Sequence, residues 1–170
     1  GSSKFAKGNR WAFFPAVSVG WRIDKENFMQ NVRAVDVLKL RGSVGEMGNQ
    51  AIGNYEYLMA VLANKSYNYS FGDVLSGGAA IKDFVDENIS WETTRTYNLG
   101  LDFEAFDHRL LFSVDLYKKR TEGILRDVKI PAQIGNLNGP KQNIGVVAND
   151  GVELNLQWRS AVKNFHYSLG

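Results

Sequence analysis

The sequence lacks cysteine, has only two histidines, and contains no apolar run of the roughly eighteen residues that a membrane-spanning helix requires. The absence of cysteine excludes a cysteine nucleophile. His108 and His166 fall in or beside expected short turns, and two imidazoles are too few ligands for a metal site. A transmembrane β-barrel stays possible, because each strand of such a barrel gives only a weak hydrophobic signal.

No large excess of either charge marks the chain, since 20 basic residues stand against 18 acidic ones and the formal net charge is +2. Basic residues such as Lys39, Arg41 and Lys118 lie among acidic residues and at expected strand ends. This distribution favours a solvated or pore-lining location over a phosphate-binding stripe. We therefore expect no nucleic-acid partner.

Motifs of catalysis are also missing. The carboxylates of residues 83–92 show neither the dense oxygen spacing of a calcium loop nor a specific glycosidase pair. Gly45-Glu46-Met47-Gly48 lacks the lysine-serine pair that follows in a phosphate-binding loop. We expect no enzymatic activity, no catalytic residue, no bound metal and no cofactor.

What the chain does have is strong alternation, clearest in residues 91–120. Each of two arms alternates apolar and polar residues, which is typical of a strand with one apolar face. A turn near 104–109 joins the arms, and each has about the ten residues that a tilted strand needs to cross a bilayer. The apolar positions are Tyr97, Leu99, Leu101 and Phe103 in the first arm, and Leu110, Phe112, Val114 and Leu116 in the second.

Similar alternation predicts strands at 13–23, at 37–46, at 152–158 and from Phe165 onward, six in all. Trp21 suits an aromatic anchor at the membrane interface. Asn149-Asp150-Gly151 admits two interpretations, a hairpin turn or a bulge within one long strand. The positions predicted to face lipid are Val17, Val19, Leu38, Leu40, Leu99, Leu101, Phe103, Phe112, Val114, Leu116, Leu154 and Leu156.

The opposite faces of these strands carry charge. Lys39 and Arg41 on one strand, and Asp102, Asp115 and Glu153 on others, would be costly in lipid. We expect them to line a hydrated lumen and to pair with one another.

The connections are unequal: 104–109 and 159–164 are turns, 24–36 is of moderate length, and 47–90 and 121–148 are long. In an up-and-down sheet the shorter links then share one end and the long ones the other, as in outer-membrane barrels. The predicted fold is therefore all-β, an antiparallel up-and-down transmembrane β-barrel fragment of about six strands with long extracellular loops. A soluble sheet with one wet face, such as a carbohydrate-binding module, is the alternative.

The first long loop contains the candidate ligand residues. Flat tyrosine rings can stack on sugar faces, and asparagine amides both donate and accept hydrogen bonds. The alternative is that these rings pack the loop against itself or sit at the barrel rim. The candidates are Asn49, Tyr55, Tyr57, Tyr67 and Tyr69.

Five stretches in order resemble the C-terminal part of the barrel of SusC/RagA-like TonB-linked outer-membrane proteins, with the weakest match at residues 58–86. An asparagine-containing turn is expected where Asp107-His108 stands. The five stretches are KFAKGNRWAFFPAVSVGWRI (4–23), LKLRGSVGEMGNQAIGNY (38–55), ISWETTRTYNLGLDF (89–103), LLFSVDLYKKRTEGIL (110–125) and NIGVVANDGVELNLQWR (143–159).

This resemblance implies active import of oligosaccharide or peptide across the bacterial outer membrane. The implied partners are membrane lipid, a SusD/RagB-like surface lipoprotein, and a TonB-type energy transducer that binds a region outside these residues. It also favours one continuous strand through Asn149-Asp150-Gly151. Because the chain starts at Gly1-Ser2-Ser3 and stops within an expected strand, we interpret it as part of a barrel from which the plug domain is absent.

Overall fold

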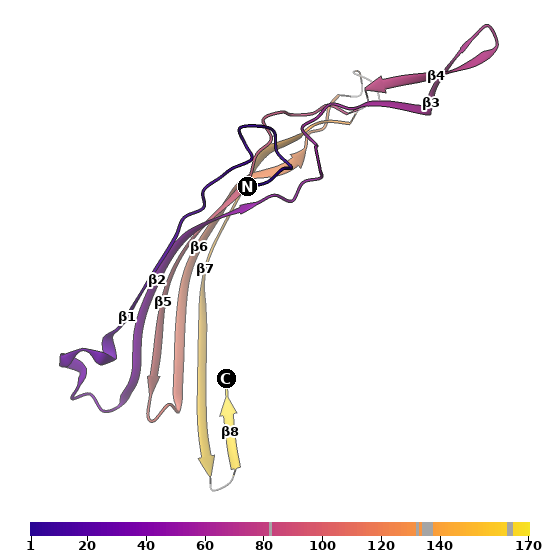
Figure 1. The fold of residues 1–170 in the computed structure, drawn as a ribbon. Coiled ribbons are helices and arrows are strands. Elements are labelled where there is room, and N and C mark those ends of the chain that lie inside the picture. Colours follow the sequence, from indigo (N-terminus) through magenta and orange to yellow (C-terminus); the bar gives the residue numbers. More distant parts are fainter. Residues whose placement is uncertain (82, 132, 134–137, 163–164) are drawn as a thin grey trace. The chain divides into compact units, whose positions relative to one another are not determined.

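A computed structural model describes residues 1–81, 83–131, 133, 138–162 and 165–170, and strands dominate it. Six strands form one sheet in the order β1-β2-β5-β6-β7-β8, so each strand pairs with the next one of this sheet along the chain (Figure 1). The all-β antiparallel up-and-down prediction is confirmed. The strands of this sheet are β1 (Ala16–Arg22), β2 (Val35–Asn49), β5 (Glu92–Ala105), β6 (Leu110–Asp127), β7 (Lys141–Val162) and β8 (Phe165–Leu169).

Two short 3-10 helices, η1 (Ile23–Lys25) and η2 (Asn27–Met29), occupy the connection between β1 and β2. Within the described residues, no helix is long and apolar enough to cross a membrane.

The strands extend further into the long connections than alternation predicted. β6 continues to Asp127 and β7 begins at Lys141, so only residues 128–140 separate them, and 121–148 is not one long loop. β7 runs unbroken from Lys141 to Val162, so the hairpin interpretation of Asn149-Asp150-Gly151 was wrong and the continuous strand is confirmed. The strand ends were missed because the alternation stops there: Ile124 and Leu125 are consecutive apolar residues, as are Val146 and Val147, and Leu125 packs against the buried core of the loops.

The first long connection contains a hairpin that alternation did not reveal. β3 (Val61–Phe71) pairs antiparallel with β4 (Val74–Ile81), and together they form a separate two-stranded sheet. Gly72 and Asp73 make the turn, with φ of 57° and 62°. Two central residues with positive φ define a hairpin turn whose twist matches that of its strands.

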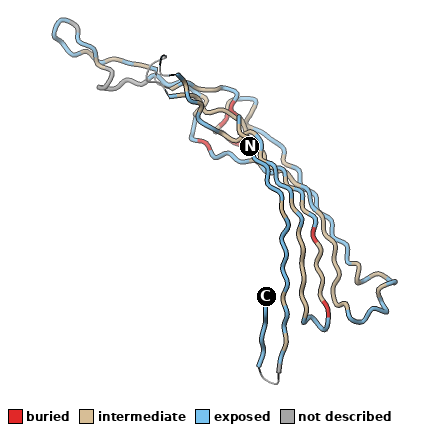
Figure 2. The backbone as a smooth tube through the Cα atoms, turned by 180° about the vertical axis from the view of Figure 1, so that it is seen from behind, coloured by how far each residue is buried: buried red, intermediate tan, exposed pale blue. Residues whose placement is uncertain are grey.

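By its contacts the chain divides into two compact units. The wall unit comprises Phe14–Met47, Thr94–Arg120 and Val147–Gly170, and the loop unit comprises Gly1–Phe13, Gly48–Thr93 and Thr121–Val146. Figure 2 shows how few segments are buried.

The loop unit has a small hydrophobic core. Phe5, Ile52 and Ile89 are 0%, 6% and 1% exposed, and Trp91 packs against them with its ring centroid 5.0 Å from that of Phe5. The terminal segment thus covers residues that lie far away in the sequence, which anchors the loops to one another.

Asparagine side chains form hydrogen bonds with backbone groups of distant segments in the loop unit. Asn143 Nδ2 donates to the carbonyls of Ser90 (2.9 Å) and Gly123 (2.7 Å), while its Oδ1 accepts from Ser90 N (2.9 Å). Asn9 Nδ2 donates to Ile89 O at 3.2 Å, and Asn9 O accepts from the Trp91 indole at 2.9 Å. Backbone groups outside the strand ladders therefore find partners.

Candidate functional site

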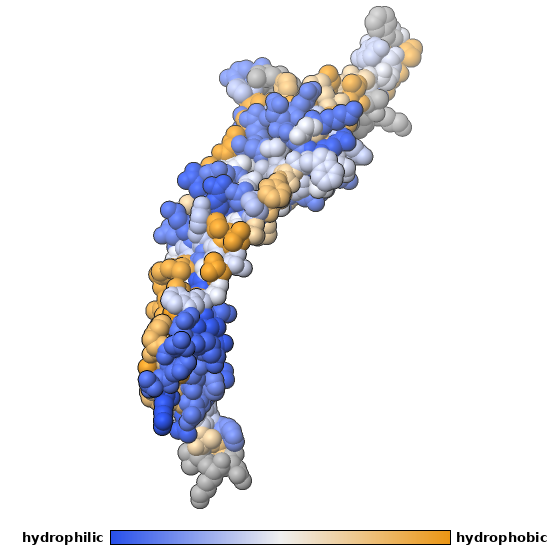
Figure 3. All heavy atoms as spheres, turned by 60° about the vertical axis from the view of Figure 1, so that its left-hand side comes forward, coloured by the Kyte–Doolittle hydropathy of each residue, from blue (hydrophilic) through white to orange (hydrophobic). Residues whose placement is uncertain are grey.

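The wall unit has two chemically different faces, set by strand register. Val17 pairs with Val44, Val19 with Gly42 and Trp21 with Leu40, and paired residues of an antiparallel ladder share a face. Because strand residues alternate, Arg41 and its neighbours two residues away lie on the other face. Figure 3 shows hydrophobic and hydrophilic residues gathered on different sides of the sheet.

The apolar face is uncovered among the described residues. Val17, Val19 and Leu154 are 64%, 65% and 69% exposed, and Leu99, Leu116 and Leu156 are also among the exposed hydrophobic residues. A soluble sheet would bury such a face beneath another layer. All twelve positions predicted to face lipid lie on this side of the alternation.

A three-residue ion cluster forms the centre of the charged face. Arg41 on β2 reaches Asp102 on β5 (Nε to Oδ2, 3.1 Å) and Asp115 on β6 (Nη2 to Oδ2, 2.7 Å). The predicted pairing among inner-face charges is confirmed for these three residues.

Gly100 makes room for this cluster, since a Cβ there would lie 2.6 Å from Arg41 Cζ. Asp115 Oδ1 has no hydrogen-bond partner among the described residues. The cluster therefore carries one negative charge in excess and one unsatisfied acceptor.

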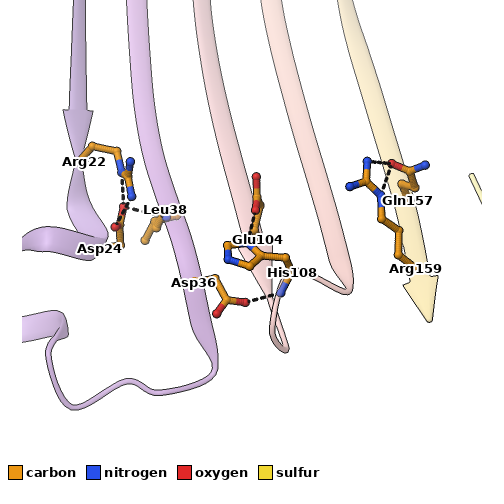
Figure 4. A network of polar contacts seen from close by, with 8 residues as sticks. All are labelled: Arg22, Asp24, Asp36, Leu38, Glu104, His108, Gln157 and Arg159. Atoms are coloured by element: carbon orange, nitrogen blue, oxygen red, sulfur yellow. Dashed lines mark hydrogen bonds and ion pairs between the residues drawn. The ribbon is translucent and has the colours of Figure 1, made fainter. Parts of the chain in front are cut away.

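A rim of polar contacts lies at the end of the sheet with the shorter connections (Figure 4). Arg22 Nε and Nη2 each donate to Asp24 at 2.7 Å, and Leu38 N donates to Asp24 Oδ1 at 3.1 Å, so the pKa of Asp24 falls well below its usual range. The Glu104 carboxylate, 2.6 Å from His108 Nδ1, raises the pKa of His108. These contacts fix the turns in place.

The β5–β6 turn is unusual because three successive residues are left-handed. Phe106, Asp107 and His108 have φ of 61°, 56° and 58°, in a region where non-glycine residues are uncommon. Phe106 N donates to Ala34 O (3.1 Å) and His108 N to Asp36 Oδ2 (2.9 Å), so the preceding connection holds this turn. A turn made without asparagine is possible because neighbouring backbone fixes it.

In the loop unit, three segments enclose a cavity of about 800 Å³. Lys141 Nζ lies 2.8 Å from Glu56 Oε1, and Asn138 Nδ2 donates to Asp83 Oδ1 at 2.6 Å, which joins the segments. The lining residues include Tyr55, Glu56, Asp83, Phe84, Asp127, Lys129 and Lys141. Aromatic rings beside carboxylates and ammonium groups suit a polar ligand with flat faces.

The residues predicted to bind a ligand occupy different environments in the structure. Tyr55 lines the cavity and is 60% exposed. Tyr57, with its ring 6.4 Å from that of Tyr55, packs against the buried Phe5 cluster, as the packing alternative expected. Asn49 Oδ1 accepts from Ala51 N at 3.1 Å, which makes it a turn residue.

Of the other two tyrosines, Tyr69 is not among the described residues that line the cavity. Tyr69 lies on β3 in the separate hairpin, and the side chain of Tyr67 lies outside the described residues. Glu56 and Lys141 were missed as cavity residues, because they lie 85 positions apart and no pattern along the chain links them. Among the described residues, no group of three or more histidine or carboxylate side chains is placed to hold a metal ion.

An up-and-down sheet with one bare apolar face and one ion-paired face defines a segment of the wall of a transmembrane β-barrel. The model of the family described as "TonB dependent receptor-like, beta-barrel" matches residues 1–170, so the chain belongs to this family. The membrane barrel is thereby favoured over a soluble carbohydrate-binding module, and the chain belongs to the bacterial outer membrane.

Similar proteins also include TonB-dependent receptors. The TonB-dependent receptor SusC of Bacteroides thetaiotaomicron is 39% identical over 172 residues, which cover 99% of this chain and 17% of SusC. The TonB-dependent receptor P3 of Formosa agariphila is 38% identical over 161 residues, with coverages of 94% and 16%. The chain thus spans about one sixth of the length of these relatives.

Solved structures show the same fold. The RagAB peptide importer in its closed-closed state superposes with a TM-score of 0.82 at 31% identity, covering 98% of this chain and 18% of the matched one. A further structure of the RagAB peptide transporter gives a TM-score of 0.80 at 33% identity, with coverages of 94% and 17%.

Proposed function

We propose that this chain contributes wall and outer loops to a SusC/RagA-like importer that carries oligosaccharide or peptide across the outer membrane. The observation that carries the proposal is the two-faced six-stranded sheet, whose apolar side is bare while its charged side pairs internally. Membership in the family supports the same function.

In this arrangement the twelve apolar positions, including Leu99, Phe112 and Leu154, contact hydrocarbon. The opposite face, with Arg41 and Asp102, borders the hydrated lumen. A charge placed on the lipid side of a barrel costs about 2–4 kcal/mol near the midplane, which explains why the charges collect on the other side.

A barrel of about 22 strands has a plugged lumen, and other parts of the protein would supply the plug of such an importer. The excess negative charge of the Arg41 cluster and the unsatisfied Asp115 Oδ1 support a cationic side chain of that plug as a neighbour. Residues 1–170 are then a partial barrel whose two longer connections lie outside the cell, one at residues 50–91 with the β3–β4 hairpin and the other at residues 128–140.

The partners follow from the same proposal. A TonB-type transducer supplies energy through a region outside these residues, and a SusD/RagB-like lipoprotein covers the outer mouth. The solved relatives named RagAB peptide importer support such a two-component complex. Within this chain, Tyr55 and the loop-unit cavity are the proposed contacts for substrate.

Uptake in whole cells tests this function. Cells that produce the full-length protein are given labelled oligosaccharides or labelled peptides, and the same cells are studied without the TonB-type transducer. We expect uptake of one substrate class to fall to background when either the protein or the transducer is removed. Uptake that persists after both deletions would contradict the proposal.

A further inference from the structure

The apolar face of the wall unit is hollowed at Gly42 on β2. The hollow has a volume of about 380 Å³. A Cβ on Gly42 would find no atom nearer than Asn98 O at 3.9 Å, so the missing side chain leaves open space rather than relieving a clash. The residues around the hollow are Val17, Val19, Ser43, Val44, Tyr97, Asn98, Leu99, Leu116 and Lys118.

The hollow has an apolar body and a cationic end. Lys118 lines it and follows Leu116 on the same face of β6, in the direction of the long connection. Toward the short β5–β6 turn, the same face of β6 continues through Val114 and Phe112. The apolar residues of this face nearest to Lys118 in the sequence therefore precede it along the strand.

A second polar contact lies beyond the hollow, toward the end of the wall that carries the long connections. Arg95, two residues beyond Tyr97, pairs with Glu46, two residues beyond Val44, and both belong to the apolar face by alternation. Charged groups on a lipid-exposed face are tolerated where it meets the headgroup region. We therefore expect Lys118 to lie where the headgroups of the outer leaflet begin.

We propose that the Gly42 hollow binds an acyl chain of an anionic lipid whose phosphate contacts Lys118. The proposal rests on the proposed function, because it requires this face to meet the membrane. This site joins a hollow lined by Val17, Val19 and Leu116 to the ammonium group of Lys118. The charge of Lys118 selects a lipid with net negative charge, and the hollow retains the chain through contacts that a flat wall lacks.

The test uses the full-length protein in nanodiscs that contain equal amounts of phosphatidylglycerol and phosphatidylcholine with identical acyl chains. Lipids that stay bound after transfer to detergent are counted by native mass spectrometry. We expect the wild-type protein to retain phosphatidylglycerol in preference to phosphatidylcholine. Lys118→Gln should lower this preference roughly fivefold, the effect of one lysine near a headgroup.

The neighbouring residue provides a matched control, because Lys119 lies on the opposite face and Lys119→Gln should leave the preference unchanged. Gly42→Leu, which fills the hollow, should reduce the retention of both lipids, whereas Gly20→Ala on the inner face should not.

Equal lipid preference in Lys118→Gln and Lys119→Gln would overturn the inference. Retention of lipid-free dimers that Gly42→Leu dissociates would also overturn it, in favour of a second barrel seated in the hollow. Transport is measured separately. Because Lys118 faces away from the lumen, the Lys118→Gln variant should import substrate normally.

Failure of the proposed function would appear as the absence of transducer-dependent uptake in the wild type. Failure of this inference appears as unchanged lipid selectivity in a protein that still imports.

Discussion

The wall unit and the loop unit obey different rules of construction. In the wall unit, strand pairing holds the backbone and the large apolar side chains stay uncovered, as for Val19 and Leu154. The loop unit instead has a buried core around Phe5 and fully used amide groups such as that of Asn143. A wall that meets lipid needs no core of its own, whereas loops in water need one to remain ordered.

The largest effect is expected from the core of the loop unit. Phe5→Ala removes a ring that is 0% exposed and should lower the free energy of local unfolding of this unit by about 3–5 kcal/mol. Native-state hydrogen exchange of the full-length protein would measure the change. Trp11, which is 82% exposed, supplies the control, and Trp11→Ala should cost less than about 0.5 kcal/mol. An equal loss of stability in Phe5→Ala and Trp11→Ala would contradict a buried core in the loop unit.

The wall unit should respond to charge instead of to cavity formation. Leu154→Lys places an ammonium group on the lipid side and should lower the free energy of unfolding in bilayers by about 2–4 kcal/mol. Asn155→Lys, one residue along on the lumen side, should change it little. Urea titration of the two refolded full-length variants makes the comparison. A greater loss for Asn155→Lys would mean that the two faces have been assigned the wrong way round.

The charged face should be sensitive to small increases in volume. Gly100→Ala would bring a Cβ to 2.6 Å from Arg41 Cζ and 2.8 Å from Asp115 Oδ1, so the ion cluster must shift. We expect a loss of about 1–3 kcal/mol in the same titration, as for overpacked sites. At Gly20 the nearest contact of a new Cβ is the flexible end of Lys39 at 3.4 Å, and Gly20→Ala should be nearly neutral. If the two alanines behave alike, the Arg41 cluster does not depend on Gly100.

The smallest effect concerns the rim of the wall unit. The pKa of His108 is raised by Glu104, so their pairing stabilises the turn fully below the ordinary imidazole pKa of about 6.5. This stabilisation is lost as the pH rises through the raised pKa. Hydrogen exchange at residues 106–109 should therefore become faster in the wild type as the pH rises through the raised pKa of His108, beyond the intrinsic change. His108→Gln should abolish this extra change, while His166→Gln should retain it.

The wall was predictable because the side on which a strand residue points depends only on odd or even position. That rule predicted the six strands and the shared face of Arg41, Asp102 and Asp115, whereas the strand order was predicted from the alternation of short and long connections. Which of these charges pair is seen only in the structure. The rule gives no signal where apolar residues follow one another, as Ile124 and Leu125 or Val146 and Val147 do, and the ends of β6 and β7 were missed for this reason.

The loop unit was not predictable in the same way. Its contacts join residues far apart, such as Asn9 with Ile89 across 80 positions and Glu56 with Lys141 across 85. No periodicity records such pairings. Tyr55 was predicted as a ligand residue because of its aromatic ring. The charged residues that line the cavity with it could be identified only from the structure, which brings the three segments together.

The left-handed turn at Phe106, Asp107 and His108 carries a consequence for the order of assembly. Its conformation depends on two acceptors, Ala34 O and Asp36 Oδ2, which precede it in the chain. We expect the hairpin of β5 and β6 to close slowly until β2 is present as a template, so that this part of the wall is built outward from its first strands. Asp107→Gly, which relaxes the backbone there, should free the hairpin from that dependence and speed its closure.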